Sequence, residues 1–80
     1  MIVVVVRTRS ANRTAEALRA AIGLGLRGDP VDVVLCAAPL PPDRRIERAL
    51  ATLEALGRPA LPWADLPRAI ARASVVEVWS

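Results

Sequence analysis

Cys36 is the residue best suited to covalent chemistry, because it is the single cysteine of an 80-residue chain that contains no histidine. A thiol becomes nucleophilic when a helix N-terminus or a nearby arginine lowers its pKa. The segment from Pro41 to Arg45 offers both features shortly after Cys36. The opposing interpretation is a small buried hydrophobic residue, since free cysteine is among the most buried residue types. Cys36 is therefore either a persulfide-carrying nucleophile or a core residue.

A second group of candidate site residues, suited to binding an anion, follows the first apolar run of the chain. Arginines and small polar residues alternate there, at the start of a predicted helix: Arg7, Arg9, Ser10, Asn12 and Arg13. The exposed N–H groups and positive end of a helix favour an anion, and guanidinium groups pair with phosphate or carboxylate. The alternative is a solvated loop in which Ser10 or Asn12 only caps the helix. No GxGxxG or P-loop pattern is present, so no nucleotide fingerprint supports the anion site.

Composition removes several classes of function. One cysteine cannot form an intramolecular disulfide or a cysteine-rich zinc site, and the lack of histidine removes most other metal and catalytic-triad chemistry. We therefore expect no metal and no cofactor. The net charge of +3 comes from arginines interspersed with eight acids rather than from one basic block, which supports RNA binding only weakly.

The apolar stretches are too short to act as membrane or targeting segments. No run approaches the roughly 18 apolar residues of a membrane span, and the run Ile2–Val6 has no preceding basic region that would make it a signal peptide. With 54% hydrophobic residues the chain is not disordered. We expect one cytoplasmic globular domain, residues 1–80, with no membrane contact.

Four apolar runs predict strands, because continuous β-branched residues are typical of strands that are covered on both faces. In order, they are Ile2–Val6, Val31–Cys36, a short stretch within Pro59–Pro62, and Val75–Trp79. Glu77 interrupts the last run, which indicates an edge strand protected by charge.

Three stretches between the strands have apolar residues at helical spacing. Their apolar stripes are Ala15, Leu18, Ile22 and Leu26 in a helix over about residues 12–27; Ile46, Leu50 and Leu53 in a helix that ends at Gly57; and Leu66, Ile70 and Ala73 in a helix capped by Asp65. Alternating strands and helices predict a small three-layer αβα sandwich of the flavodoxin or Rossmann type, with a three- or four-stranded, mainly parallel sheet. Ligands of such sheets bind beyond the carboxyl ends of the strands, where the strand order reverses.

The two tryptophans are the only aromatic residues, and both lie in the C-terminal quarter of the chain. Tryptophan is enriched both in cores and at interfaces. A domain of this size has a thin core, and self-association is a common remedy. We therefore predict a homo-oligomer, with Trp63, Leu66 and Trp79 at its interface.

The order of elements, the start Met1–Val6 and the end Leu61–Trp79 resemble the DsrE-like sulfur-relay proteins. Those chains tend to finish with an L-x-x-L-x-x-x-x-x-x-A-x-x-V-x-x-W/F pattern, and the comparable residues here are Leu66, Ala69, Ile70, Ala73, Val75, Val76 and Trp79. The resemblance implies an oligomeric α/β subunit with sulfur-relay proteins as partners. Catalytic members carry a persulfide on a cysteine after the third strand, where Pro59–Pro62 has none. The resemblance therefore implies a non-catalytic subunit.

Three hypotheses for function result. The first is a non-catalytic DsrE-like subunit that acts through oligomer contacts and an anion-binding loop at Arg7–Arg13. The second is a sulfurtransferase-type persulfide carrier that uses Cys36. The third is an anion- or RNA-backbone-binding module that uses Arg7, Arg9 and Arg13. We favour the first, and so a non-enzyme.

Overall fold

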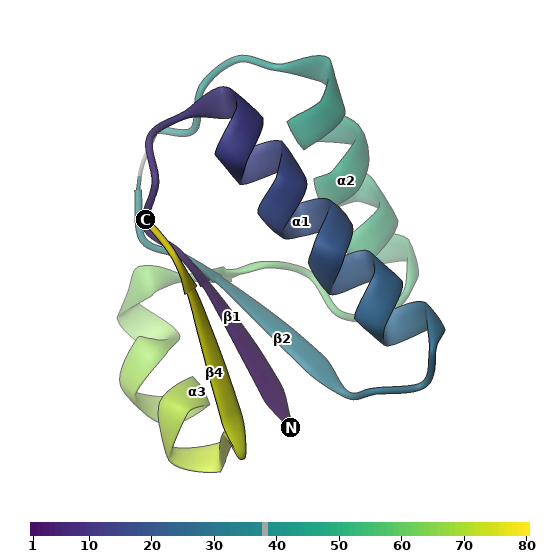
Figure 1. The fold of residues 1–80 in the computed structure, drawn as a ribbon, viewed down its shortest axis with the longest axis vertical. Coiled ribbons are helices and arrows are strands. Elements are labelled where there is room, and N and C mark those ends of the chain that lie inside the picture. The colour runs from purple at the N-terminus through teal and green to yellow at the C-terminus, as the bar shows by residue number, and fades with distance from the viewer. Residues whose placement is uncertain (38) are drawn as a thin grey trace.

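A four-stranded, all-parallel sheet forms the centre of the computed structural model, which describes residues 1–37 and 39–80 (Figure 1). The strands are β1 (Ile2–Val6), β2 (Val31–Leu35), β3 (Leu61–Pro62) and β4 (Val75–Trp79), and they lie side by side in the order β3-β2-β1-β4. The predicted α/β class with a mainly parallel sheet is confirmed.

Helices cover the two faces of the sheet unequally. Helices α1 (Ala11–Leu26) and α2 (Arg44–Ala55) lie together on one face, whereas α3 (Leu66–Arg72) lies alone on the other (Figure 1). A single 3-10 turn, Trp63–Asp65, leads into α3. None of the described helices is long and apolar enough to cross a bilayer.

Strand β1 is the middle of the structure. Its residues Val3–Val6 are buried, because β2 pairs with one edge, β4 pairs with the other, and helices lie on both faces. The register places Ile2 opposite Val31 in β2 and opposite Val75 in β4. The continuous β-branched run at the start of the chain is therefore a fully covered strand, as the sequence pattern predicts.

Each face of the sheet has its own apolar core. The larger core packs Leu18 of α1 and Ile46 of α2 against Val4 and Val33, and all four side chains are fully buried or nearly so. Among the described residues, the smaller core under α3 contains four buried members: Val3, Val5, Val34 and Ala69. The α3 side of the molecule is therefore the less well covered side.

Two details of the predicted helices are wrong. Leu26 is 71% exposed, because the buried positions of α1 end at Ala21 and the last turn extends beyond the core. The side chain of Asp65 makes no capping hydrogen bond. The preceding 3-10 turn already has helical backbone geometry, so Asp65 does not stand at a boundary between extended and helical chain.

The prediction of an edge strand is confirmed. Strand β4 is the last strand of the sheet, it pairs only with β1 among the described residues, and Glu77 lies exposed in its middle. Unlike β1, this strand is exposed along most of its length.

Candidate functional site

The carboxyl ends of β1 and β4 mark the point where the strand order reverses. The chain leaves β1 toward β2, while β4 lies on the opposite side of β1. Here the backbone N–H groups of Arg7 and Thr8 both donate to the carbonyl oxygen of Trp79, at 2.8 Å and 3.0 Å. In open α/β sheets this is the usual place for a ligand.

The loop after β1 is held by its own small polar residues. Ser10 is the N-cap of α1, and its Oγ accepts a hydrogen bond from the N–H of Arg13 at 3.3 Å. The N–H of Ser10 donates in turn to Oγ1 of the buried Thr8 at 3.1 Å. Of the two predicted caps, Ser10 is therefore the one in the structure.

Two members of the predicted anion site make contacts within the chain instead. The guanidinium carbon of Arg13 lies 5.3 Å from the centre of the Trp79 ring, and its Nε donates to the carbonyl oxygen of Ser80 at 2.7 Å. The side-chain oxygen of Asn12 accepts from Nη2 of Arg45 at 2.8 Å. The structure therefore does not gather the five predicted residues into one cradle.

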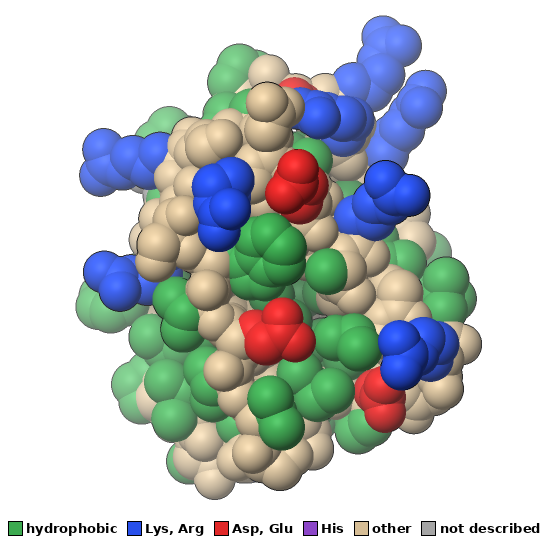
Figure 2. Space-filling view, in the orientation of Figure 1, with side chains coloured by type: hydrophobic (Ala, Val, Ile, Leu, Met, Phe, Trp, Pro, Cys, Tyr) green, Lys and Arg blue, Asp and Glu red, His purple; other side chains and the backbone are tan. Residues whose placement is uncertain are grey.

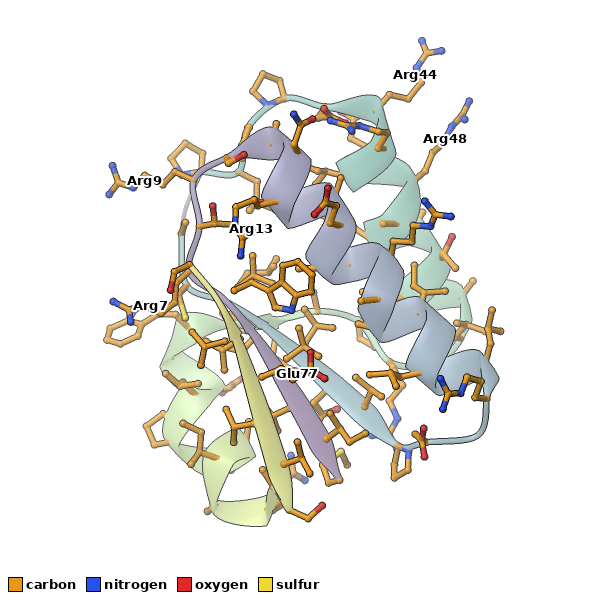
Figure 3. The ribbon with its side chains drawn as sticks, viewed as in Figure 1. Arg7, Arg9, Arg13, Arg44, Arg48 and Glu77 are labelled. Carbon is orange, nitrogen blue, oxygen red and sulfur yellow. The ribbon has the colours of Figure 1, made fainter. Side chains whose placement is uncertain are left out.

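Arg7 and Arg9 are the members that remain directed toward solvent. Both are exposed, and Figure 3 shows their side chains pointing away from the sheet, with Arg44 and Arg48 extending from α2 at the same end of the molecule. An anion at this end would therefore meet separate, solvated guanidinium groups. The described residues supply positive charge here, and Arg9 lines an open hollow with Ala37, Pro39 and Pro41, but they do not enclose an anion.

Arg45, held by Asp43, joins the start of α2 to the start of α1. The carboxylate of Asp43 caps α2 by accepting from the N–H of Arg45 at 2.8 Å, and it also pairs with the Arg45 guanidinium at 2.8 Å. The hydrogen bond from the Arg45 side chain is the main cause that lowers the pKa of Asp43 to about 2. Since the same guanidinium reaches Asn12, this exposed cluster connects the two helices.

A groove beside α3 brings together residues that the sequence analysis placed in three different groups. Its floor is Val5 of β1 with Val76 and Val78 of β4, and its wall is Leu66 and Ile70 of α3 with Trp63. Arg7 and Cys36 close the end at which β1 and β2 finish. We call this hollow of about 410 Å³ the α3 groove.

Most of the α3 groove is apolar and open to solvent. Trp63 is 65% exposed, Val78 53%, Ile70 45% and Val76 42%. In Figure 2 hydrophobic side chains gather over the part of the surface where Figure 1 places β4 and α3, and arginines lie above this region and at the right of the molecule. Large apolar side chains exposed in one continuous patch are typical of a binding surface.

Cys36 lines the end of this groove and also packs against the smaller core under α3. Its side chain is half-buried, and its backbone N–H donates to the carbonyl oxygen of Val6 at 2.9 Å. Among the described residues Arg7 is the one cation that lines the groove with it. Whether this thiol reacts stays a prediction.

Trp63 and Trp79, which the sequence analysis placed at one interface, lie on different sides of the sheet. Trp63 and Leu66 line the α3 groove, but Trp79 packs against the core under α1 and beneath Arg13. Side chains alternate between the two faces of a strand, which is why Trp79 and its neighbour Val78 belong to different surfaces.

Asp32 is a buried acid for which the sequence analysis proposed no role. It points to the α3 side of β2, where it pairs with Arg58 at 3.3 Å and Arg72 at 3.5 Å. These two arginines follow α2 and end α3, so Asp32 ties both segments to the sheet. The sequence did contain a sign of this role: Asp32 is the single carboxylate inside the apolar run Val31–Leu35. A charge buried in such a strand requires a partner of opposite charge.

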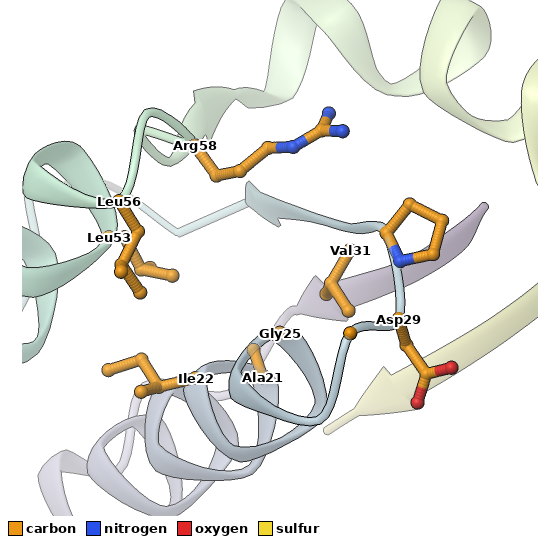
Figure 4. Close-up of a pocket in the computed structure, with 10 residues that line it drawn as sticks. Ala21, Ile22, Gly25, Asp29, Val31, Leu53, Leu56 and Arg58 are labelled. Atoms are coloured by element: carbon orange, nitrogen blue, oxygen red, sulfur yellow. The ribbon is translucent and has the colours of Figure 1, made fainter.

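A separate hollow of about 310 Å³ lies at the opposite end of the sheet, between the C-terminal ends of α1 and α2 (Figure 4). Its wall combines apolar side chains with the charged residues Asp29 and Arg58, and Figure 4 shows the carboxylate of Asp29 turned away from the side chain of Arg58. Arg58 is already paired with Asp32. We find no nucleophile or acid–base pair among the residues that line this hollow.

Comparisons with known protein families, with curated proteins and with solved structures gave no match. By its fold and its site, the protein is a small parallel α/β sandwich with an apolar groove beside its edge strand.

Proposed function

We propose that this chain is a non-catalytic association subunit that binds a second copy of itself through the surface formed by α3 and β4. The observation that carries the proposal is the exposure of β4: Val75, Val76 and Val78 are each between 42% and 53% exposed in a strand composed mostly of apolar residues. A strand of this composition is normally covered.

The exposed area is sufficient for a specific contact. Val76, Val78, Ile70 and Trp63 on the α3 side of the sheet, with Val75 on the other side of the β4 edge, together leave roughly 500 Å² of apolar surface per copy. Two copies would then bury about 1,000 Å² of apolar side-chain surface, the size at which specific interfaces begin. We therefore expect a reversible dimer with a dissociation constant on the order of micromolar.

The DsrE-like part of the proposal rests on the apolar pattern from Leu61 to Trp79. Under it, the chain is an oligomeric sulfur-relay subunit whose partners include other sulfur-relay proteins. The groove supports association in general, since an apolar surface binds another apolar surface.

The test is sedimentation velocity of the purified chain between about 1 and 100 µM. We expect the average mass to rise with concentration from that of the 8.5 kDa monomer. Val78→Lys, which puts a charge in the α3 groove, should shift the protein to monomer with unchanged circular dichroism. Leu26→Lys is the matched control, because Leu26 is 71% exposed and lies at the end of α1. A wild-type chain that stays monomeric at 100 µM would overturn the proposal.

The second candidate function is a persulfide carrier, favoured by the position of Cys36 in the same groove as Arg7. Intact-mass measurement after incubation with a persulfide donor tests it. A gain of one sulfur atom, lost in Cys36→Ala, would support carriage of sulfur. An unmodified wild-type mass would exclude it. The anion- or RNA-backbone-binding alternative now rests mainly on Arg7 and Arg9.

A further inference from the structure

The outer edge of β4 offers unpaired backbone groups. The carbonyl oxygen of Trp79 accepts from Arg7 and Thr8, so the backbone of Trp79 faces β1. Because backbone groups point to alternate sides along a strand, the N–H and C=O of Val76 and Val78 face away from β1. No described strand pairs with this edge. An edge of this kind is a template for another strand.

We infer that two copies join β4 to β4 in antiparallel orientation, forming one eight-stranded sheet across a two-fold axis. This inference rests on the proposed function and specifies its geometry. A closed dimer of identical subunits has two-fold symmetry, and two-fold pairing of one strand with itself is antiparallel.

The five residues of β4 favour one register. When Glu77, the central residue, lies on the two-fold axis, every residue from Val75 to Trp79 is opposite a residue of the partner strand. Val76 then stands opposite Val78 of the second copy, at positions where both outward N–H groups and both carbonyl groups form hydrogen bonds. The dimer contains two such Val76–Val78 pairs, and each pair exchanges two backbone hydrogen bonds. Four hydrogen bonds therefore join the two sheets.

In this register the side chains on the α3 side are all valine. Cross-strand pairs of β-branched residues stabilise a sheet, and here two Val76–Val78 pairs form side by side. They connect the two α3 grooves into one continuous apolar surface between the α3 helix of one copy and that of the other. On the α1 side, Val75 stands opposite Trp79 of the second copy.

Glu77 is the one unfavourable residue in this arrangement. Its carboxylate projects from the exposed middle of β4 and makes no ion pair among the described residues (Figure 3). The central pair is a non-hydrogen-bonded one, in which side chains approach closely. Two carboxylates directly opposite each other weaken the dimer. Glu77 would therefore limit the strength of edge-to-edge association.

A charge-swap experiment tests the register. Glu77→Lys alone should self-associate no better than wild type, because two lysines also repel each other. An equimolar mixture of wild type and Glu77→Lys should form a mixed dimer about tenfold tighter than either homodimer at low salt. Glu77→Gln, which removes the charge without reversing it, should tighten the homodimer about fivefold.

The matched control is Glu54→Lys, which makes the same change of charge at an exposed position of α2. It should give no preference for mixed dimers. Hydrogen exchange provides a second measurement without mutation: the Val76 and Val78 amides should exchange more slowly as concentration rises, and the Leu26 amide should not respond. A dimer that ignores the charge at residue 77 and leaves both valine amides unprotected would overturn the edge pairing while the proposed function stands. A chain that never dimerises would overturn both.

Discussion

Replacing Leu18 by alanine is expected to lower the free energy of unfolding by about 3 kcal/mol, because the change removes a fully buried side chain from the larger core. An 80-residue domain has a total stability of only about 4–12 kcal/mol, so this substitution removes a large share of it. Urea denaturation followed by circular dichroism measures the loss, which should appear as a lower midpoint with an unchanged slope.

Leu26→Ala is the control for this prediction. Both leucines belong to the stripe that the sequence predicts for α1, but Leu26 is 71% exposed. Its replacement should change the free energy of unfolding by no more than about 0.5 kcal/mol. Equal losses at the two positions would mean that the last turn of α1 packs against the core in solution.

The order of elements could be predicted because each one is specified by local pattern. Val3–Val6 form a β-branched run that only a covered strand accommodates, and the leucine and alanine stripe of α1 has the period of a helix. The position of β4 at the edge was also visible, since Glu77 would be costly in a strand covered on both faces.

The site could not be predicted to the same degree, because the direction of a side chain depends on partners distant in sequence. Arg13 turns toward Trp79 and Ser80, which lies 67 residues away, and Asn12 binds Arg45, which lies 33 residues away. Both were expected to face an anion. No local sequence pattern shows that such a partner exists. The sequence therefore predicts more side chains free to bind an anion than the structure has.

The α3 groove was missed as a unit for a related reason. Arg7, Cys36 and Trp63 were each singled out, but they follow three different elements and meet only through the parallel sheet. The carboxyl ends of parallel strands lie at one end of a sheet, which brings Arg7 and Cys36 together. Strand β4 is uncovered because of the position in which α3 packs on the sheet. The apolar spacing of α3 alone does not specify that position.

The two tryptophans should behave differently when each is replaced by alanine. Trp79 packs against the larger core and supports Arg13, and it is partly exposed. Trp79→Ala should therefore lower the free energy of unfolding by about 2 kcal/mol, somewhat less than the cost of truncating a fully buried tryptophan. Because most contacts of Trp79 are within one chain, most of this loss should be the same at every protein concentration. Only the Val75–Trp79 pair of the dimer adds a smaller loss that depends on concentration.

Trp63→Ala should show the reverse behaviour. Trp63 is 65% exposed in the α3 groove, so its removal costs the monomer no more than about 0.5 kcal/mol. Removing its apolar area should instead weaken self-association, and the melting temperature of the wild type should exceed that of the variant only at concentrations where the wild type dimerises. Thermal melts at about 2 and 200 µM, combined with sedimentation, separate the two effects. If Trp79→Ala showed the larger concentration-dependent loss and Trp63→Ala showed none, the association surface would lie on the α1 side of β4, and the α3 groove would have no part in it.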